Sequence, residues 1–346
     1  MAGTIDFKCP SCGAYLEFDP GKNAFVCGYC GSEFTEAQLQ EFSGRRQETA
    51  EKETQGGRLK EYHCANCGAE IVTGETTAAT RCYFCHNPVV ITDRVTAEYT
   101  PDGVIPFALT EEEAQEQFHA YLKKRWFVDR RFFSEAQMEN FSGVYYPYWI
   151  GDIAGEGTFE GEGKTVSTMT TGRWLVTTTK YYKLEREGNL LFRNMVRKAL
   201  NQADRQLSDG IHPYDLSGMK PFAAGYLSGF LAEKRDVEKA DAANDMMQEA
   251  RGYVREMMTR DSGLSGVTGT ETFTPTETRE RYVLLPAWVL TYVHEASGRV
   301  FYYMMNGQNG RVCGKLPIHW GKLLAMAFGV GAAVAGLLCA GGAFLW

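Results

Sequence analysis

The sequence predicts a multidomain chain with two small all-β modules, an α+β domain containing an antiparallel sheet, and a C-terminal transmembrane helix. Three observations support this prediction. Eight of the ten cysteines fall into four C-x-x-C pairs near the N-terminus. The middle of the chain combines aromatic, β-branched segments with helix-start signatures. The last 24 residues, from Leu323 to Trp346, carry no charge.

The cysteine pairs recur at a fixed interval, which indicates a duplicated module. The second set of four lies 55 positions after the first. The first set is Cys9, Cys12, Cys27 and Cys30, and the second set is Cys64, Cys67, Cys82 and Cys85. The flanking sequences FKCPSCGA and YHCANCGA also agree. We therefore expect all-β modules at residues 1–35 and 60–95, joined by a polar linker at residues 36–59.

Each module has the spacing C-x2-C-x14-C-x2-C, which is typical of a metal site. We expect no secretory signal, because the opening MAGTIDFKCP lacks a basic region followed by an apolar one. In a reducing compartment such thiols hold metal more often than they form disulfides. Two tight turns supply four thiolates in the tetrahedral arrangement that zinc prefers. The prediction is two structural Zn²⁺ ions, with iron as the competing metal and redox-active dithiols as a third interpretation.

Residues 100–318 are expected to form the α+β domain. It opens with the apolar segment VIPFAL and a capping box, Thr110 with Glu113, for a helix that ends near Arg125. Antiparallel strands are favoured in GVYYPYWI, RWLVTTTKYYKLE, RYVLLPAWVLTYV and RVFYYMMNG, with a Gly/Thr-rich stretch between the first two. Two helices are expected within residues 222–260. The second would bury a stripe made of Val237, Ala240, Met247, Ala250, Val254 and Met257.

Catalytic motifs are absent from the sequence, so we expect that the protein is not an enzyme. It contains no H-E-x-x-H, no G-x-S-x-G, and no G-x-G-x-x-G between a strand and a helix. The segment GEGKT, from Gly161, resembles the end of a phosphate-binding loop, but such a loop needs glycine where Thr158 stands. Core packing explains the central aromatic cluster better than a substrate pocket does. That cluster is Tyr145, Tyr146, Tyr148 and Trp149.

Residues 322–346 are expected to form the transmembrane helix. The uncharged run would be about 36 Å long as a helix, enough to cross about 30 Å of hydrocarbon. Basic residues precede this run and none follows it, so the positive-inside rule places the N-terminal domains in the cytosol. The chain would be a single-pass protein of the cytoplasmic (inner) membrane. Small residues recur every four positions and suit helix–helix association, at Ala332, Gly336 and Ala340.

The segments after the second module are more distinctive than the cysteine pairs. They include VIPFALTEEEA, GVYYPYW, PYDLSGMKPFAAGYLSGFLAEKRDVE, LLPAWVL and MNGQNGRVCGKLPI. Together with the CPSCG and CANCG turns, they resemble a bacterial group of membrane-anchored tandem zinc-ribbon proteins. This group is the transcription-factor-IIB-type zinc ribbon family, often mislabelled as primosomal helicases. The resemblance implies scaffolding at the inner membrane, in an envelope-stress response.

The function favoured by the sequence is a membrane-anchored zinc-ribbon adaptor. It would contact the bilayer and present binding surfaces to cytosolic or membrane proteins. The alternative is a nucleic-acid-binding zinc-ribbon protein tethered to the membrane. Charge weighs against this alternative, because the net charge is -7 and the first module sets two lysines against four carboxylates. A surface that binds phosphates should be basic.

Overall fold

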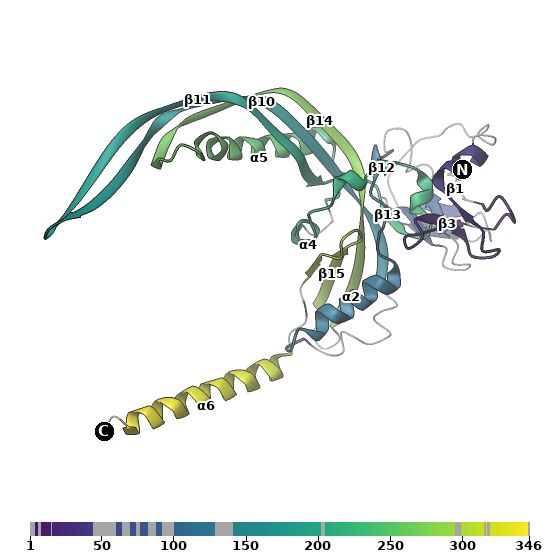
Figure 1. The fold of residues 1–346 in the computed structure, drawn as a ribbon. Helices are drawn as coiled ribbons and strands as arrows, with labels where there is room; N and C mark the ends of the chain where they lie inside the picture. The colour runs from purple at the N-terminus through teal and green to yellow at the C-terminus, as the bar shows by residue number, and fades with distance from the viewer. Residues whose placement is uncertain are drawn as a thin grey trace.

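Three long antiparallel strands form the framework of the protein (Figure 1). The central strand, β10 (Phe141–Thr171), pairs with β11 (Trp174–Lys198) on one side and with β14 (Ser265–His294) on the other. These strands curve into an arch, and α5 (Lys239–Thr259) lies along its inner side (Figure 1). This computed structural model describes residues 4–5, 8–14, 16–43, 60–63, 70–73, 77–81, 88–91, 100–128, 141–201, 205–294, 299–314, 316 and 319–344.

Shorter strands extend the framework into an eleven-stranded sheet among the described residues. On one side, β13 (Leu231–Glu233) pairs with β10, and two strands of the second cysteine module, β7 and β8, continue beyond β13. On the other side, β15 (Arg299–Asn306) pairs with β14. The remaining strands are β1 (Thr4–Ile5), β7 (Thr77–Arg81), β8 (Pro88–Ile91), β9 (Gly103–Val104), β12 (Lys220–Pro221) and β16 (Val312–Gly314).

Two smaller sheets belong to the cysteine modules. The first module has a three-stranded sheet of β2 (Leu16–Asp19), β3 (Ala24–Cys27) and β4 (Glu33–Phe34). The second has a two-stranded sheet of β5 (Lys60–His63) and β6 (Glu70–Thr73). The short helical elements are α1 (Glu36–Ser43), α4 (Arg205–Gly210) and the 3-10 turns η3 (Leu216–Gly218) and η4 (Ala224–Leu227).

The Gly/Thr-rich stretch does not interrupt the sheet, because it lies inside the continuous strand β10. Its glycines stand where neighbouring groups come too close for a side chain. A Cβ atom on Gly161 would lie 2.2 Å from the backbone oxygen of Thr268, and one on Gly157 would lie 2.7 Å from Leu190 Cδ1. Glycine here marks close packing rather than a break. The chain is therefore mostly β, and the α+β prediction for residues 100–318 is wrong.

The helices confirm one prediction and correct another. The capping box is present at the start of α2 (Glu111–Lys123), where the Thr110 hydroxyl accepts a hydrogen bond from the Glu113 N–H. Only one of the two helices predicted within residues 222–260 forms, since η4 and β13 occupy the first part. The stripe that α5 buries shares only Ala250 and Val254 with the predicted one. It consists of Ala242, Met246, Ala250, Val254 and Met258, four positions apart.

The C-terminal helix α6 (Trp320–Phe344) occupies the segment predicted to span a membrane. Among the described residues, no helix has both the length and the apolar character needed to cross one. This finding overturns the transmembrane helix at 322–346, the single-pass anchor, the bilayer contact and the inner-membrane location. Association through Ala332, Gly336 and Ala340 stays a prediction.

Aromatic side chains pack against the centre of the sheet in two clusters of buried residues, with Tyr148 in a different cluster from Tyr145 and Trp149. Tyr145, Tyr148 and Trp149 are buried, which confirms the predicted packing role for these three. Phe107 stacks on Phe230 with ring centroids 4.2 Å apart, and further aromatic rings surround this pair. Close packing of such large rings contributes to stability both through burial and through ring geometry.

A buried asparagine closes the end of β15. The Asn306 side chain is fully buried, and its Nδ2 donates to the carbonyls of Ile211 and Pro213 at 3.0 and 3.3 Å. Its Oδ1 accepts from the backbone N–H groups of Gln308 and Asn309 at 2.8 and 3.1 Å. Each polar atom of this amide is therefore satisfied, and the side chain joins the turn after β15 to the loop after α4.

We expect Asn306→Asp to destabilise the protein by about 3–5 kcal/mol at pH 8, because a buried carboxylate would face two carbonyl oxygens. Burial raises the pKa of the introduced carboxyl, so its deficit relative to the parent should shrink as the pH falls and the group becomes neutral. Denaturant unfolding at several pH values measures this. Asn309→Asp, at an exposed neighbour that donates to Pro213, should cost much less. Equal losses would contradict the assigned role of Asn306.

Candidate metal centre

Two matching turns present the first four cysteines. In the first turn the Cys9 N–H donates to the Ala14 carbonyl, and the Gly13 N–H donates back to the Cys9 carbonyl. The second turn repeats this pattern with Cys27, Ser32 and Gly31. Both glycines have a positive φ, +78° and +71°, which a residue with a side chain adopts only with strain. We call these turns the two knuckles.

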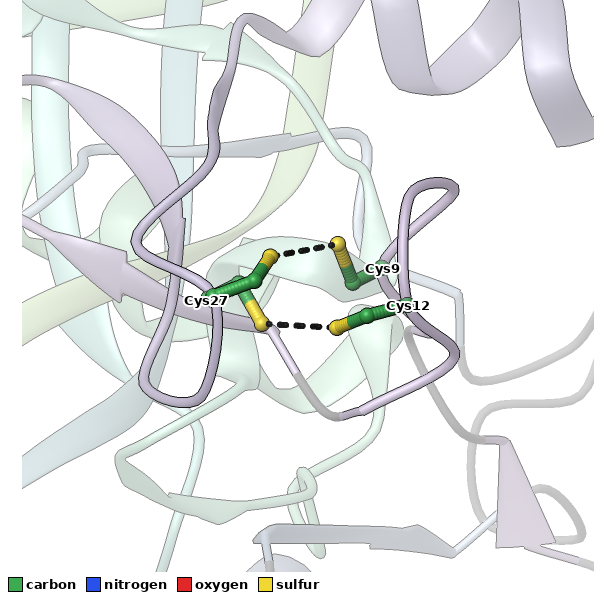
Figure 2. Close-up of side chains that lie close together, drawn as sticks. Cys9, Cys12 and Cys27 are labelled. Atoms are coloured by element: carbon green, nitrogen blue, oxygen red, sulfur yellow. Dashed lines mark hydrogen bonds between the residues drawn. The ribbon is translucent and has the colours of Figure 1, made fainter.

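The knuckles bring four sulfur atoms together (Figure 2). All four lie within 4.8 Å of one another, with Cys9 and Cys30 Sγ 3.6 Å apart and Cys12 and Cys27 Sγ 3.5 Å apart. A tetrahedral site with metal–sulfur bonds of about 2.3 Å has sulfurs about 3.8 Å apart, so this cluster fits one ion. Cys9 and Cys27 are buried, whereas Cys12 and Cys30 are exposed. These cysteines can bind a metal.

The thiols of this cluster differ in acidity. Hydrogen bonds between the Cys30 sulfur and the hydroxyl and N–H of Ser32 lower the pKa of Cys30 to about 6. The Ala14 N–H lowers the pKa of Cys12, but desolvation and the other thiols together raise it to about 12. The negative charges of thiolates this close together repel one another. A bound divalent cation offsets this repulsion and stabilises all four thiolates. The donor set therefore favours a metal ion over free thiols.

The first module is seated on the sheet domain through its own strands. Phe18 of β2 and Phe25 of β3 pack on Tyr226 of η4, with ring centroids 5.1 and 5.7 Å apart. The Phe18 N–H donates to the Ser228 carbonyl, and the Ser228 hydroxyl donates to the Leu16 carbonyl. The Tyr226 hydroxyl donates to Glu36 at 2.7 Å. Because Cys27 ends β3, the cysteine cluster and the docking contacts share one strand.

The second predicted site lies outside the described residues. Its ligands would be Cys64, Cys67, Cys82 and Cys85, none of which is described. The flanking strands are described, and β7 and β8 join the eleven-stranded sheet.

Sequence reasoning missed two features of this part of the protein. The docking residues Tyr226 and Ser228 lie in a segment predicted to be helical, so their contact with the first module was not expected. A groove of about 1380 Å³ beside β11 was also missed, because its walls come from distant segments. These walls are residues 191–198 of β11, the loop after α4 and the acidic face of α5, where Arg197 pairs with Glu249.

Fold and site together define a mostly β protein with a four-cysteine cluster that can hold a metal. No family model matches the chain, and no solved structure matches it. It is 30% identical over 343 residues to the uncharacterized protein YdjG of Bacillus subtilis (strain 168), covering 99% of this chain and 96% of YdjG. The chain therefore belongs to the same family as YdjG.

We expect Cys27→Ser to abolish metal binding at the first cluster and to loosen the module from the sheet domain, because β3 carries both. Limited proteolysis should then cut within residues 8–43 at least about tenfold faster, following the population of the opened module. Cys313→Ser, which removes a thiol outside the cluster, should change neither metal content nor cleavage. Unchanged cleavage in Cys27→Ser would show that the docking contacts hold the module without metal.

Proposed function

We propose that this protein is a zinc-binding adaptor, in which a closed four-cysteine site fixes an N-terminal module on a long β-sheet domain that binds protein partners. The convergence of four sulfurs within 4.8 Å on two matched knuckles carries this proposal. Four protein ligands leave no coordination position for water or substrate, which suits a structural ion. The adaptor is assigned no membrane anchor.

Zinc is the proposed metal, and a second zinc site is proposed at Cys64, Cys67, Cys82 and Cys85. The repeat interval of 55 residues supports the second site, since it gives that module the same ligand spacing as the first. Thiolate-only tetrahedral sites suit zinc or iron, and zinc needs no redox partner. Under this proposal the chain is a relative of the tandem zinc-ribbon proteins named above.

The knuckle tips supply a protein-binding surface. Tyr29 stands at the tip of the second knuckle, between Gly28 and Cys30, and is 85% exposed. The cluster fixes the backbone beside this ring, so little conformational entropy would be lost when a partner covers it. Tyrosine anchors of this kind contribute much of the affinity in protein interfaces. The first module's excess of carboxylates over lysines suits a protein partner better than a nucleic acid.

Metal analysis tests the zinc assignment. We expect two zinc ions per purified chain, and one per chain when Cys64 and Cys67 are both replaced by serine. Chelation at low pH should release zinc, because protonation of thiolates competes with the metal. Iron in place of zinc would overturn the choice of metal. One ion in the unmodified chain would overturn the second site alone.

Partner capture tests the adaptor role. We expect Tyr29→Ala to lose a specific set of proteins that co-purify from the native host, with zinc content unchanged. Trp126→Ala removes an aromatic ring of similar exposure, 76%, outside the knuckles and should retain them. Mass spectrometry of both samples measures the difference. Identical partner sets, or co-purified nucleic acid released by salt, would contradict the proposal.

A further inference from the structure

Strand β11 forms an open edge of the arch (Figure 1). Among the described residues it pairs with β10 and with no other strand, along its whole length from Trp174 to Lys198. The pairing of β10 with β14 ends at Lys164, opposite Ser265. Beyond that point the hairpin continues as a two-stranded ribbon to its turn at Gly172 (Figure 1). From Trp174 to Phe192, the outer side of β11 thus presents a long row of backbone donors and acceptors with which no other described strand pairs.

Such an edge is costly to leave open in water. Two-stranded ribbons are at best marginally stable alone, and long exposed edges invite pairing with another strand. This ribbon also exposes large apolar side chains. Trp174, Leu175 and Tyr181 are 77%, 71% and 74% exposed. An additional strand beside β11 would satisfy the backbone groups and cover part of this surface.

We propose that the outer edge of β11 pairs antiparallel with β11 of a second copy of this chain, around a two-fold axis at Leu184. The pairing would join the two arches into one continuous sheet. It uses the same patch on both copies, as closed dimers require. This surface is separate from the cysteine cluster and does not depend on the proposed zinc function.

The hairpin turn restricts the possible registers. Thr171 faces Trp174 across a two-residue turn, so the even-numbered residues of β11 hydrogen-bond to β10. The odd-numbered residues then point their N–H and C=O groups outward. An antiparallel copy must pair odd-numbered residues with odd-numbered ones. One residue near the two-fold axis must therefore lie directly opposite the same residue of the second copy.

Charge selects the register among those that remain. With the axis at Leu184, each Lys183 faces Glu185 of the other copy, while Tyr182 faces Arg186. Lys183 and Glu185 already form an ion pair within the strand, and both side chains are well exposed. A second copy would complete an alternating set of four charges. Moving the axis by one residue in either direction would place Lys183 against Lys183 or Glu185 against Glu185, which is unfavourable.

The side chains at the axis also suit this arrangement. Leu184 lies opposite Gly161, on the same face of the ribbon as the buried Phe159. It is partly buried against the core, so the two leucines would meet beside the apolar interior of each arch. Farther along the same face, Val176 of one copy would lie opposite Phe192 of the other. These apolar contacts share their face with the Tyr182–Arg186 pairs, whereas the Lys183–Glu185 pairs lie on the other face.

Charge reversal tests the proposal on the purified full-length chain, with sedimentation velocity as the measurement. The unmodified chain should be a dimer. Lys183→Glu and Glu185→Lys should each weaken it by at least about tenfold in Kd, because each creates two like-charge contacts. An equimolar mixture of these two variants should restore dimers, since each lysine would again face a glutamate. The double variant K183E/E185K should also dimerise.

Cross-linking tests the register independently. Residues opposite each other in a non-hydrogen-bonded pair have Cα atoms about 4.5 Å apart, within the range of a disulfide. Leu184→Cys should therefore form a covalent dimer under mild oxidation. Tyr182→Cys is the matched control, because the two copies of residue 182 would lie about 13 Å apart along the strands. Circular dichroism should show that all variants remain folded.

Several results would overturn the proposal. These are a monomeric unmodified chain at micromolar concentration, equal cross-linking of Leu184→Cys and Tyr182→Cys, and failure of the variant mixture to dimerise when the single variants are folded. Open-ended assembly would also overturn it, because that indicates head-to-tail contacts. Stronger association of K183Q/E185Q would show that these charges protect the edge from pairing.

Discussion

The pairing of β10 with β14 is the interaction on which the rest of the structure depends. It runs from Phe141 opposite Leu290 to Lys164 opposite Ser265. Every other strand of the main sheet is attached to these two strands, either directly or through an intervening strand. β11 and β13 pair with β10, while β9 and β15 pair with β14. A one-residue slip in this register would turn the buried face of both strands outward, so the register is strongly specified.

The inner helix shows how this register is used. α5 packs against β10, β11 and β14 through residues four positions apart. Met246 lies against Gly151, where a Cβ atom would meet its sulfur at 2.3 Å. Glycines along β10 thus let the helix and the neighbouring strands approach closely. The close packing of the helix on the arch therefore depends on where β10 lacks side chains.

Local patterns in the sequence predicted the features that local physics determines. The capping box at Thr110 predicted α2, and the first two C-x-x-C pairs predicted which of the described sulfurs converge, because each knuckle is closed by hydrogen bonds within six residues. Features that depend on distant partners were predicted poorly. The stretch that holds Gly157 and Gly161 was placed between two strands rather than within one, since nothing in that segment reveals Leu190 or Thr268 beside these glycines. The apolar character of residues 322–346 likewise suggested a membrane span that the described helix does not support.

The first module illustrates the same division within one site. Its four cysteines could be identified from spacing, whereas its docking on Tyr226 could not, because Phe18 and Tyr226 are about two hundred residues apart in the sequence. A side chain's partner across such a separation is set by the whole topology. The segment that receives the module also looked helical in isolation, and tertiary contacts overrode that preference.

That receiving segment also links the two modules through the sheet. Tyr226 contacts the first module, and Leu231, five residues later, begins β13. β13 pairs with β10 on one side and with β7 of the second module on the other. Both modules therefore contact one short stretch of chain, residues 226–233. On β10, β13 and β11 occupy successive stretches of one edge, at Val144–Tyr145 and from Tyr148 onward, while β14 fills the opposite edge. The modules and the β11 hairpin are therefore aligned along the same side of the central strand.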